Sequence, residues 1–525
     1  MTTSVQANPS VTPTSREIDS LDDLRNACHG TFPLSGRLES WMTAALTDAD
    51  NRAAVLAVLD RYGSPTHFLS TQPMLETAKA WTSAAEDRGL NFQVYFARKA
   101  NKALCFVDAA LHGGLGIDTA SDPEVSQTLE RGFPADRVVC TAAIKNSALI
   151  DRCIEAGVTL VVDNLDEWRQ VVSATQNSGA TARIAFRLSG FWHAGEKLHS
   201  RFGIDVDDLE AMFDRQLTEG LGSAADVADV KQRVEVVGLH FHLDGYDADQ
   251  RVSAIHQCLP WVLRLRSLGH PVTFVDIGGG VPMSYLEDED QWTGFWKAHE
   301  RCLLDPEFVE VTHRRHPLGR RVLNDRVDDQ PNVYPFFQQP IGIQWWQKVW
   351  DADLKPIEGF RADTVAGAFV ESGLQMRCEP GRSLLDGCGM TAATIRFRKR
   401  HPKGFHYIGL EMNRTQCRTT TDDFLVDPIL VRRGEAAGEA MSGFFVGSYC
   451  TESELISLRR MEIPRGCEVG DVVIFPNTAG YLMHFLESRS HQFPLAANVV
   501  LTSDSAAPDR QAWRRDLIDE MSAGC

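Results

Sequence analysis

The sequence predicts an α/β fold joined to an all-β fold: a (β/α)8 TIM-like barrel followed by a C-terminal β-sandwich or β-barrel domain. A chain of 525 residues exceeds what a single hydrophobic core usually organises, so two domains are expected. From about residue 60, short apolar runs alternate with longer helix-like stretches. After about residue 385 the runs are strand-like and few helical stretches separate them, which favours a mostly β second domain.

The barrel is predicted from strand-like runs that recur at regular intervals. These runs are THFLS (66–70), VYFARKA (94–100), GIDTAS (116–121), VVCTA (138–142), LVVDN (160–164), IAFRLS (184–189), VVGLHFHL (236–243) and VTFVDIGGG (272–280). Strands that alternate with helices are typical of parallel βαβ units, and eight or so units within roughly 250 residues favour a closed barrel. An open, doubly wound sheet is the alternative architecture.

The composition along the chain predicts further segments around and within the two domains. The predicted parts are a flexible N-terminal arm (1–25), a segment that packs on the β domain (26–60), the barrel (61–390) with an insertion (about 283–370), and the β domain (391–525). The insertion is predicted because the stretch from Gly280 to Glu379 is far longer than one βα step. It holds five of the eleven tryptophans: Trp292, Trp296, Trp345, Trp346 and Trp350.

The charge balance and the cysteines exclude several classes of function. With 53 basic and 71 acidic residues the net charge is −18, so the protein repels a phosphate backbone and nucleic acid is not an expected partner. No run of about 18 apolar residues and no signal peptide is found, which predicts a cytoplasmic protein without a membrane partner. The 12 cysteines form no Cys-x-x-Cys pair, so reduced thiols are expected rather than disulfides or structural zinc.

Lys99 is the first candidate for chemistry. It lies in VYFARKA, after a strand-like run and before a predicted helix, which in a barrel is the face where active sites form. Burial and the neighbouring cations Arg98 and Lys102 would lower the pKa of its amine, which suits an imine-forming lysine. The alternative is an ordinary solvated lysine.

Three further motifs offer polar groups. In GLHFHLDGY, His240 and His242 lie two residues apart on a strand and so share one face; they fit a metal pair, a ring stacked on a flat cofactor, or interior histidines, and we predict no metal. FVDIGGG ends a strand in three glycines, whose amides can approach an anion, although a tight turn is the simpler interpretation. EPGRS (379–383) offers a carboxylate and a guanidinium, or an ion pair that holds a loop.

The ordered series ARKAN, DTASDPE, SRFGI, GLHFH, DIGGG, EPGRS, GSYC and GDVVIFPNTAGY resembles the fold-type III pyridoxal-phosphate decarboxylases, which include the diaminopimelate and ornithine decarboxylases. The resemblance extends from about residue 60 to 485. It implies an alanine-racemase-like barrel with a β domain, and pyridoxal 5'-phosphate as the cofactor.

The resemblance also implies a role for individual residues. The residues expected to bind the cofactor are Lys99 (covalently), Asp118, His242 (stacked on the ring), Gly278, Gly279 and Gly280 (phosphate), Glu379 (ring nitrogen), Arg382 and Tyr481 (phosphate). Cys450 in GSYC matches the cysteine that enters the partner subunit's site and would protonate the α-carbon. A carboxylate at the ring nitrogen keeps the pyridine protonated, which favours decarboxylation over racemisation.

The chain departs from the family pattern at two places. Where the family usually reads His-x-Gly-Ser, this chain reads His242-Leu243-Asp244-Gly245, which removes a hydroxyl from the phosphate and brings in a carboxylate. The residue after Cys450 is Thr451 instead of the acid that binds a distal amine, with Glu452 next in the chain. Thr451 and Glu452 are therefore the candidate substrate residues, and substrates with a distal ammonium are disfavoured.

The insertion suggests what replaces that ammonium. Its basic run contains four arginines: Arg314, Arg315, Arg320 and Arg321. Together with the tryptophans they predict a bulky or acidic distal group, unless they form a solvated surface patch.

The expected protein is a homodimeric, pyridoxal-phosphate-dependent carboxy-lyase with shared active sites. Its substrate is expected to be an amino acid or an amino-acid-derived small molecule of a biosynthetic, secondary-metabolite-type pathway. Two alternatives stay open: a racemase, epimerase or eliminase on the same fold, and a non-catalytic protein that binds the same cofactor.

Overall fold

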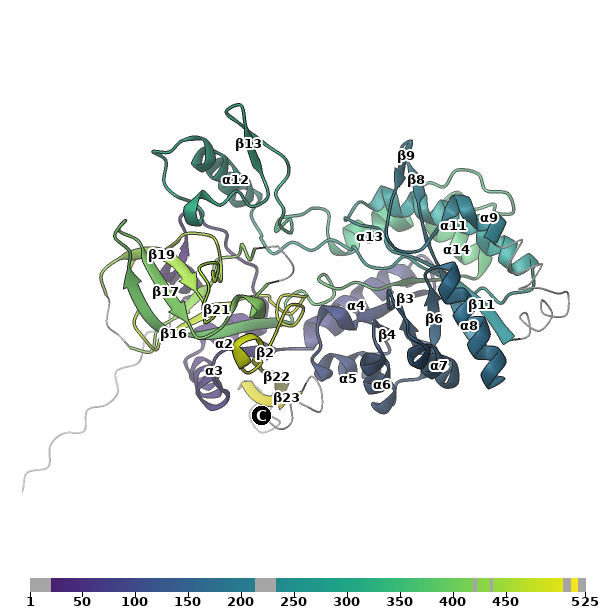
Figure 1. Cartoon of the computed structure of the whole chain (residues 1–525), viewed down its shortest axis with the longest axis horizontal. Coiled ribbons are helices and arrows are strands. Elements are labelled where there is room, and N and C mark those ends of the chain that lie inside the picture. The colour runs from purple at the N-terminus through teal and green to yellow at the C-terminus, as the bar shows by residue number, and fades with distance from the viewer. Residues whose placement is uncertain (1–19, 213–232, 419–422, 435–437, 504–510, 518–525) are drawn as a thin grey trace, which may run out of the picture.

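The computed structural model describes residues 20–212, 233–418, 423–434, 438–503 and 511–517, which form two domains side by side along the long axis (Figure 1). The barrel lies at one end and a mostly β domain at the other. Among the described residues, no helix is long and apolar enough to cross a membrane.

Eight parallel strands close the barrel. They are β3 (Phe92–Ala97), β4 (Gly116–Thr119), β5 (Val138–Cys140), β6 (Thr159–Val162), β7 (Ala182–Ser189), β11 (Val234–Phe241), β12 (Phe274–Asp276) and β15 (Gln375–Cys378). Each strand pairs with the next, and β15 pairs back to β3, which an open sheet would not do. The predicted (β/α)8 barrel is therefore confirmed, and the doubly wound alternative was wrong.

Helices surround the barrel. They are α4 (Gln72–Glu86), α5 (Leu104–His112), α6 (Asp122–Glu130), α7 (Ser147–Ala156), α8 (Leu165–Ser178), α9 (Leu209–Met212), α11 (Ala248–Ser267), α13 (Gly342–Trp350) and α14 (Val365–Ser372). Side chains of Ser121, Asn146 and Asn164 accept backbone N–H bonds at the starts of α6, α7 and α8. Gly157 and Gly179 end α7 and α8 in the left-handed conformation. These caps keep several of the connections to the strands short.

The second domain is built on a ten-stranded sheet. Its strands are β1 (His29–Gly30), β2 (Thr66–Leu69), β16 (Gly389–Arg400), β17 (His406–Leu410), β18 (Ile429–Val431), β19 (Met441–Val446), β20 (Met461–Ile463), β21 (Val472–Phe475), β22 (Ala497–Ser503) and β23 (Gln511–Asp516). The predicted all-β domain is confirmed. The assignment of run 66–70 to the barrel was wrong, because β2 pairs with β16 and β22. A short buried run does not indicate which sheet it enters.

The N-terminal helices pack on this sheet. They are α1 (Leu21–Ala27), α2 (Ser40–Thr47) and α3 (Ala49–Tyr62). Leu24, Met42 and Val55 share a buried cluster with Met390 and Val472 of the sheet. Residues 21–25, which we predicted to be part of a flexible arm, lie instead in α1, because Leu24 is buried and Ser20 caps the helix. Residues 1–19 lie outside the described part of the chain.

The long stretch between β12 and β15 contributes to both domains. Residues 283–337, which we call the insertion lobe, contain α12 (Glu289–Leu304), β13 (Arg321–Leu323) and β14 (Arg326–Asp328). Their core joins that of the second domain, and the lobe stands above that domain in Figure 1. By contrast, α13 packs on α4 and α11 of the barrel, where Trp345, Trp346 and Trp350 are buried. Three of the five tryptophans are thus barrel core.

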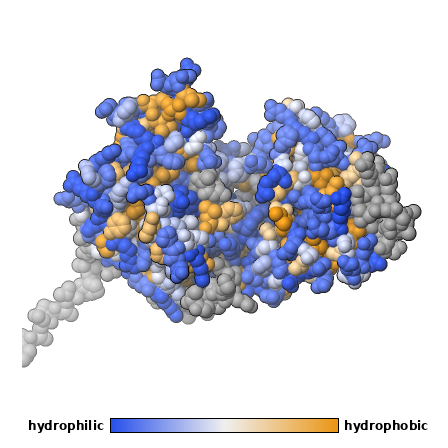
Figure 2. Space-filling model, viewed as in Figure 1, coloured by the Kyte–Doolittle hydropathy of each residue, from blue (hydrophilic) through white to orange (hydrophobic). Residues whose placement is uncertain are grey.

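The surface is divided by a notch between the insertion lobe and the barrel (Figure 2). The barrel side of the notch carries a hairpin of β8 (Phe191–His193) and β9 (Glu196–Leu198), followed by β10 (Ile204–Asp205), which pairs with β7. Exposed apolar residues of the insertion lobe include Val309, Val322 and Leu323. In Figure 2 apolar surface gathers over this lobe.

Candidate active site

The candidate residues lie where five neighbouring or facing barrel strands end. Asp118 is the second-last residue of β4, Lys99 follows β3 in a short 3-10 helix, and His242 follows β11 directly. Gly278 follows β12, and Glu379 is the first residue after β15. In a parallel barrel the carboxyl ends of all strands meet at one edge, so residues far apart in the sequence converge there.

Lys99 is paired with Asp118. Its Nζ lies 3.3 Å from Asp118 Oδ2, and the lysine side chain is 35% exposed whereas the aspartate is buried. Asp118 also accepts a hydrogen bond of 2.5 Å from the Thr141 hydroxyl, which fixes the carboxylate. The amine is therefore oriented by a carboxylate and is only partly buried.

The expected low pKa of Lys99 is not found. Burial lowers the pKa of its amine, but the charges of Asp118, Tyr481 and Glu379 outweigh this and raise the pKa above its ordinary value. Sequence neighbours such as Arg98 do not decide the result, because the carboxylates come from other strands. The protein without a bound ligand therefore holds Lys99 as an ammonium ion.

A buried polar cluster lies beside the lysine. Ligand atoms of His240, Asp276 and Glu379 lie within 4.8 Å of one another, and His240 Nε2 is 3.3 Å from Glu379 Oε1. Burial raises the pKa of both carboxyl groups and keeps the pKa of His240 well below its ordinary value. Glu379 Oε1 makes no hydrogen bond within the protein. A buried acceptor of this kind needs a donor from a ligand.

His242 faces the glycine loop. A Cβ on Gly279 would lie 3.7 Å from His242 Cε1 and 3.0 Å from the Glu379 carbonyl oxygen. Burial, with the charge of Lys99, lowers the pKa of His242 to about 3, so the ring is neutral at pH 7. A neutral imidazole that is only partly buried is suited to stack on a flat aromatic ring.

Arg251 lies behind the glycine loop and holds the neighbouring loop that follows β11. This buried guanidinium of α11 donates to the carbonyl oxygens of Leu243, Gly245 and Asp247. The φ angles of Gly278 and Gly280 are 67° and 82°, in the left-handed region that favours glycine. A Cβ at Gly280 would also collide with the Arg251 guanidinium. The loop is therefore a close-fitting backbone cradle for an anion.

Gly280→Ala is expected to open this cradle. The strained φ and the displaced Arg251 side chain should cost about 1–3 kcal/mol, which we expect as an about tenfold or greater loss of affinity for pyridoxal 5'-phosphate. Titration of the cofactor-free protein, followed by absorbance, measures it. The matched control is Gly294→Ala in α12, where a Cβ meets nothing within 4 Å. Equal affinities for the two variants would contradict the role of the loop.

Arg382 and Tyr481 come from different domains and meet at the same edge. The Arg382 guanidinium carbon lies 5.3 Å from the centre of the Tyr481 ring, and its Nη1 donates to the Tyr285 hydroxyl at 3.1 Å. Tyr481 has a left-handed φ of 68°, and its N–H donates to the Ala100 carbonyl oxygen beside Lys99. Only a residue without a Cβ fits at Gly381, against which the Tyr481 hydroxyl lies.

The described residues fit pyridoxal 5'-phosphate. The site offers a lysine amine, a neutral imidazole, an anion cradle and a buried acceptor, all on one barrel edge. Buried polar atoms there without a hydrogen bond include Glu379 Oε1, Asp118 Oδ2 and Asp276 Oδ2. Lys99 would hold the aldehyde carbon, and Glu379 the ring nitrogen.

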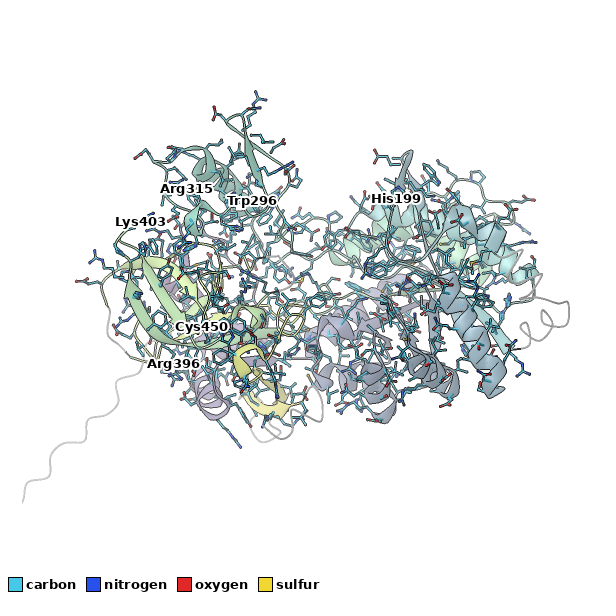
Figure 3. All side chains as sticks on the ribbon, viewed as in Figure 1. His199, Trp296, Arg315, Arg396, Lys403 and Cys450 are labelled. Atoms are coloured by element: carbon cyan, nitrogen blue, oxygen red, sulfur yellow. The ribbon has the colours of Figure 1, made fainter. Side chains whose placement is uncertain are left out.

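Three predicted residues lie elsewhere. Cys450, Thr451 and Glu452 follow β19 on an exposed loop of the second domain, where Figure 3 labels the cysteine. Glu452 Oε2 is 3.7 Å from Arg314 Nη2 of the insertion lobe. Asp244, which we expected to disturb a phosphate, is exposed and accepts a bond from the Gly245 N–H.

The sequence interpretation missed three residues of the site. Arg187 of β7 is buried, donates to Asp163 at 2.8 Å, and lowers the pKa values of His240 and Glu379. Its position inside the apolar run IAFRLS was a usable signal. Asp276 directly precedes the glycines and accepts the Gly278 N–H at 2.9 Å. Arg251 lies on a helix with no local motif, so only the fold identifies it.

A closed barrel that carries these groups at its carboxyl edge, with a β domain adding a tyrosine, defines a pyridoxal-phosphate-dependent enzyme. Residues 73–302 match the family described as "Pyridoxal-dependent decarboxylase, pyridoxal binding domain". Over these residues the chain is similar to the fold-type III pyridoxal-phosphate-dependent decarboxylases, and the cofactor that this match indicates is pyridoxal 5'-phosphate.

Individual relatives span nearly the whole chain. The uncharacterized protein y4yA of Sinorhizobium fredii is 27% identical over 88% of this chain and 92% of its own length. Diaminopimelate decarboxylase of Staphylococcus aureus is 20% identical over 88% and 95%. The crystal structure of diaminopimelate decarboxylase from Helicobacter pylori, complexed with L-lysine, superposes with a TM-score of 0.59 at 16% identity, covering 89% and 99%. The fold is thus shared over both domains.

Proposed function

We propose that the protein decarboxylates an amino acid, or a metabolite derived from one, in a biosynthetic pathway of the secondary-metabolite type. The observation that carries the proposal is Glu379, a buried carboxylate with an oxygen that lacks a hydrogen bond. Bound pyridoxal 5'-phosphate supplies an electron sink for the pair left behind when a bond to the α-carbon breaks. Glu379 supports that chemistry by holding a proton on the ring nitrogen.

The other residues position and release the reacting groups. Lys99 would hold the cofactor, and Asp118, whose Oδ2 lies 3.3 Å from Nζ, would orient the lysine amine. His242 would lie against the cofactor ring, and the loop of Gly278, Gly279 and Gly280 would bind the phosphate with Arg382 and Tyr481. The strands hold these groups before substrate arrives, so little reorganisation is needed during the reaction.

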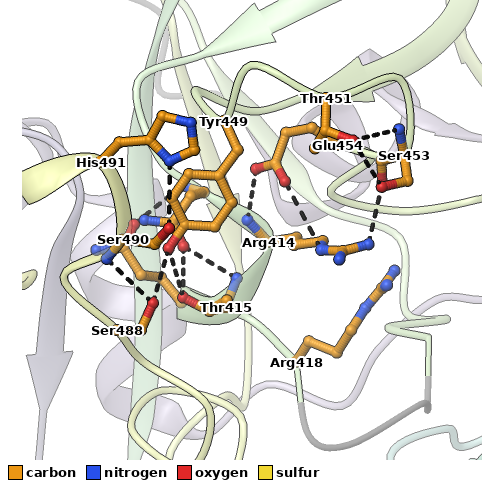
Figure 4. A network of polar contacts seen from close by, with 12 residues as sticks. Arg414, Thr415, Arg418, Tyr449, Thr451, Ser453, Glu454, Ser488, Ser490 and His491 are labelled. Carbon is orange, nitrogen blue, oxygen red and sulfur yellow. Dashed lines mark hydrogen bonds and ion pairs between the residues drawn. The ribbon is translucent and has the colours of Figure 1, made fainter.

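Cys450 is proposed as the acid that protonates the α-carbon in the partner subunit of a homodimer. Among the described cysteines it is exposed, whereas the others are buried. Its neighbour Tyr449 anchors the loop, because the tyrosine hydroxyl is hydrogen-bonded with Ser488 at 3.1 Å and the ring stacks on His491 at 5.1 Å (Figure 4). An exposed thiol on an anchored loop is suited to enter a second copy of the chain.

Mixing two inactive variants tests the shared site. Cys450→Ala and Lys99→Ala should each abolish clean decarboxylation, while a mixture re-assembled from equal amounts should recover about a quarter of the wild-type rate, because half of the random dimers hold one intact site of two. Carbon dioxide release on the best substrate is the measurement. In the reference mixture of Lys99→Ala with Cys467→Ala, a buried cysteine outside the loop, about half of the wild-type rate should remain, because Cys467→Ala keeps both reacting groups.

The results of these measurements distinguish the possible roles of Lys99 and Cys450. Recovery in the first mixture requires Lys99 and Cys450 to act from different chains. No recovery, with each variant shown to be dimeric, contradicts the shared site. Unchanged turnover of Cys450→Ala alone would contradict the role of the thiol, and a change from carbon dioxide release to deuterium exchange at the α-carbon would make the protein a racemase or epimerase.

A further inference from the structure

A cavity lies between the insertion lobe and the second domain. Its volume is about 830 Å³, within the range of small-molecule sites. Its walls come from separate stretches of chain: residues 313–314, 316–319 and 332–333 of the insertion lobe, and residues 414–415, 418, 452–453, 455, 458 and 486 of the second domain. The cavity therefore exists only because the insertion lobe docks on this domain.

The charged groups in the cavity wall are mostly cations. Arg314, Arg414 and Arg418 line it, against a single lining carboxylate, Glu452. Burial lowers the pKa values of His313 and His316, so both rings are neutral at pH 7. An ammonium group entering the cavity would meet three guanidinium groups, whereas an anion would be attracted.

Two of these arginines are fixed in place, and Figure 4 shows the contacts of Arg414. The Arg414 backbone N–H donates to Glu454 Oε1 at 2.8 Å, and its Nη1 donates to the Ser453 carbonyl oxygen at 3.2 Å. Arg418 donates through Nη2 to Asp423 at 2.6 Å, and its buried Nε makes no hydrogen bond. Backing carboxylates hold these side chains still, so that remaining donors can bind a planar anion without much ordering cost.

The rest of the wall is apolar. Leu318, Val333, Leu455, Leu458 and Leu486 complete the cavity. Such a surface suits a carbon chain that ends in charged oxygens, since the chain packs against leucines while the oxygens face guanidinium groups.

The cavity adjoins the loop that the proposed function brings to the partner subunit's site. Glu452 and Ser453 line it within three residues of Cys450. A substrate that meets Cys450 in that site therefore has its distal part close, along the chain, to the residues of the cavity wall.

We infer that this cavity binds the distal part of the substrate and selects an anionic end group, a carboxylate or a phosphate, over an ammonium. The inference rests on the proposed function, which brings Cys450 to the α-carbon. Arg314 contributes from the insertion lobe, and Arg414 and Arg418 from the second domain. Thr451, next to Cys450, leaves the distal amine of a basic substrate without a carboxylate at that position.

The other arginines of the predicted basic run serve the structure of the lobe. Arg315 donates to the carbonyl oxygens of Asp305, Pro306 and Phe308. Arg320 pairs with Glu300 and lies over Trp296, and Arg321 pairs with Asp329 within the hairpin. Of the four arginines we considered for an acidic group, only Arg314 lines the cavity.

Binding of matched amino acids to the holoenzyme tests the inference. The compounds are L-2-aminoadipate (distal carboxylate), 2-amino-5-phosphonopentanoate (distal phosphonate), L-norleucine (apolar) and L-lysine (distal ammonium). Each is titrated while the visible spectrum of the bound cofactor reports the Kd. The variant is Arg314→Gln, which removes an exposed guanidinium. The matched control is Arg326→Gln, an exposed arginine of the same lobe outside the cavity wall.

One or both anionic compounds should bind at least about tenfold more tightly than norleucine, and lysine should bind most weakly. The stronger of the two anions identifies the end group. Arg314→Gln should weaken anion binding about tenfold while the Kd of norleucine stays the same, and Arg326→Gln should change neither. The constant norleucine value shows that the variant remains folded.

Lysine binding as tightly as both anions would overturn the inference and leave the proposed function intact. Equal effects of Arg314→Gln on norleucine and on the anions would overturn it as well. If no amino acid changes the spectrum of the holoenzyme, the proposed function fails first, and this inference fails with it.

Discussion

Lys99→Ala is expected to abolish covalent attachment of the cofactor and to reduce turnover by roughly 10³-fold or more. This is near the upper end of the rate loss that follows removal of a positioned acid–base group. The amine is the nucleophile within 3.3 Å of Asp118 on the barrel edge, and the described site offers no second lysine in contact with that carboxylate. Borohydride reduction followed by peptide mass mapping should label Lys99 in the wild type and leave this variant unlabelled.

The matched control is Lys102→Ala. Lys102 lies three residues further along the same loop and is exposed, so its loss removes the same charge outside the site. It should retain the labelled Lys99 peptide and near-normal turnover. A label on any other lysine in the wild type would overturn the assignment of Lys99.

Glu379→Gln is expected to separate binding from chemistry. The glutamine keeps the shape and lies in the same buried contact with His240, but it carries no negative charge to hold a proton on the ring nitrogen. Loss of one preorganised charge of this kind costs about 3–4 kcal/mol, so the rate should fall by roughly 10²–10³-fold. Pyridoxal 5'-phosphate should still bind, because the glycine loop and Lys99 are unchanged.

Turnover and cofactor affinity must be measured separately on this variant. Glu371→Gln is a suitable control, since its carboxylate accepts N–H bonds from Arg361 and Ala362 on the outside of the barrel. A Glu379→Gln enzyme with wild-type turnover would contradict the role of the carboxylate. If the variant lost only its affinity for the cofactor, and turned over normally once saturated with it, Glu379 would be a structural residue.

The alternation of strand-like and helix-like stretches in the sequence was enough to predict the barrel. Alternating strands and helices leave few options for the chain between 92 and 378, so the barrel followed from the sequence. The partners of β2 did not, because Thr66–Leu69 is buried on both faces and an apolar run of four residues is compatible with either sheet. Pairing over more than 300 residues leaves no local signal.

In the site, too, short motifs identified some residues, whereas properties that depend on distant parts of the chain could not be predicted. Lys99, Glu379 and the glycines could be named from short motifs, since each chemistry needs a particular residue type at a particular strand end. The electrostatic state of Lys99 could not, because it depends on Asp118 and Glu379 from other strands. Arg251, which lies behind the glycine loop, is on a helix whose sequence carries no local motif.

The position of β2 between β16 and β22 has a consequence for synthesis of the chain. Apart from the insertion lobe, the barrel is encoded in the stretch between β2 and β16, and a domain encoded in this way can fold as a unit as it is made. The second domain, in contrast, must wait for Ala497–Ser503 to reach a strand made more than 400 residues earlier. A ribosome that stops early therefore releases a barrel without its tyrosine and without its thiol loop, so that only a finished chain assembles a complete site.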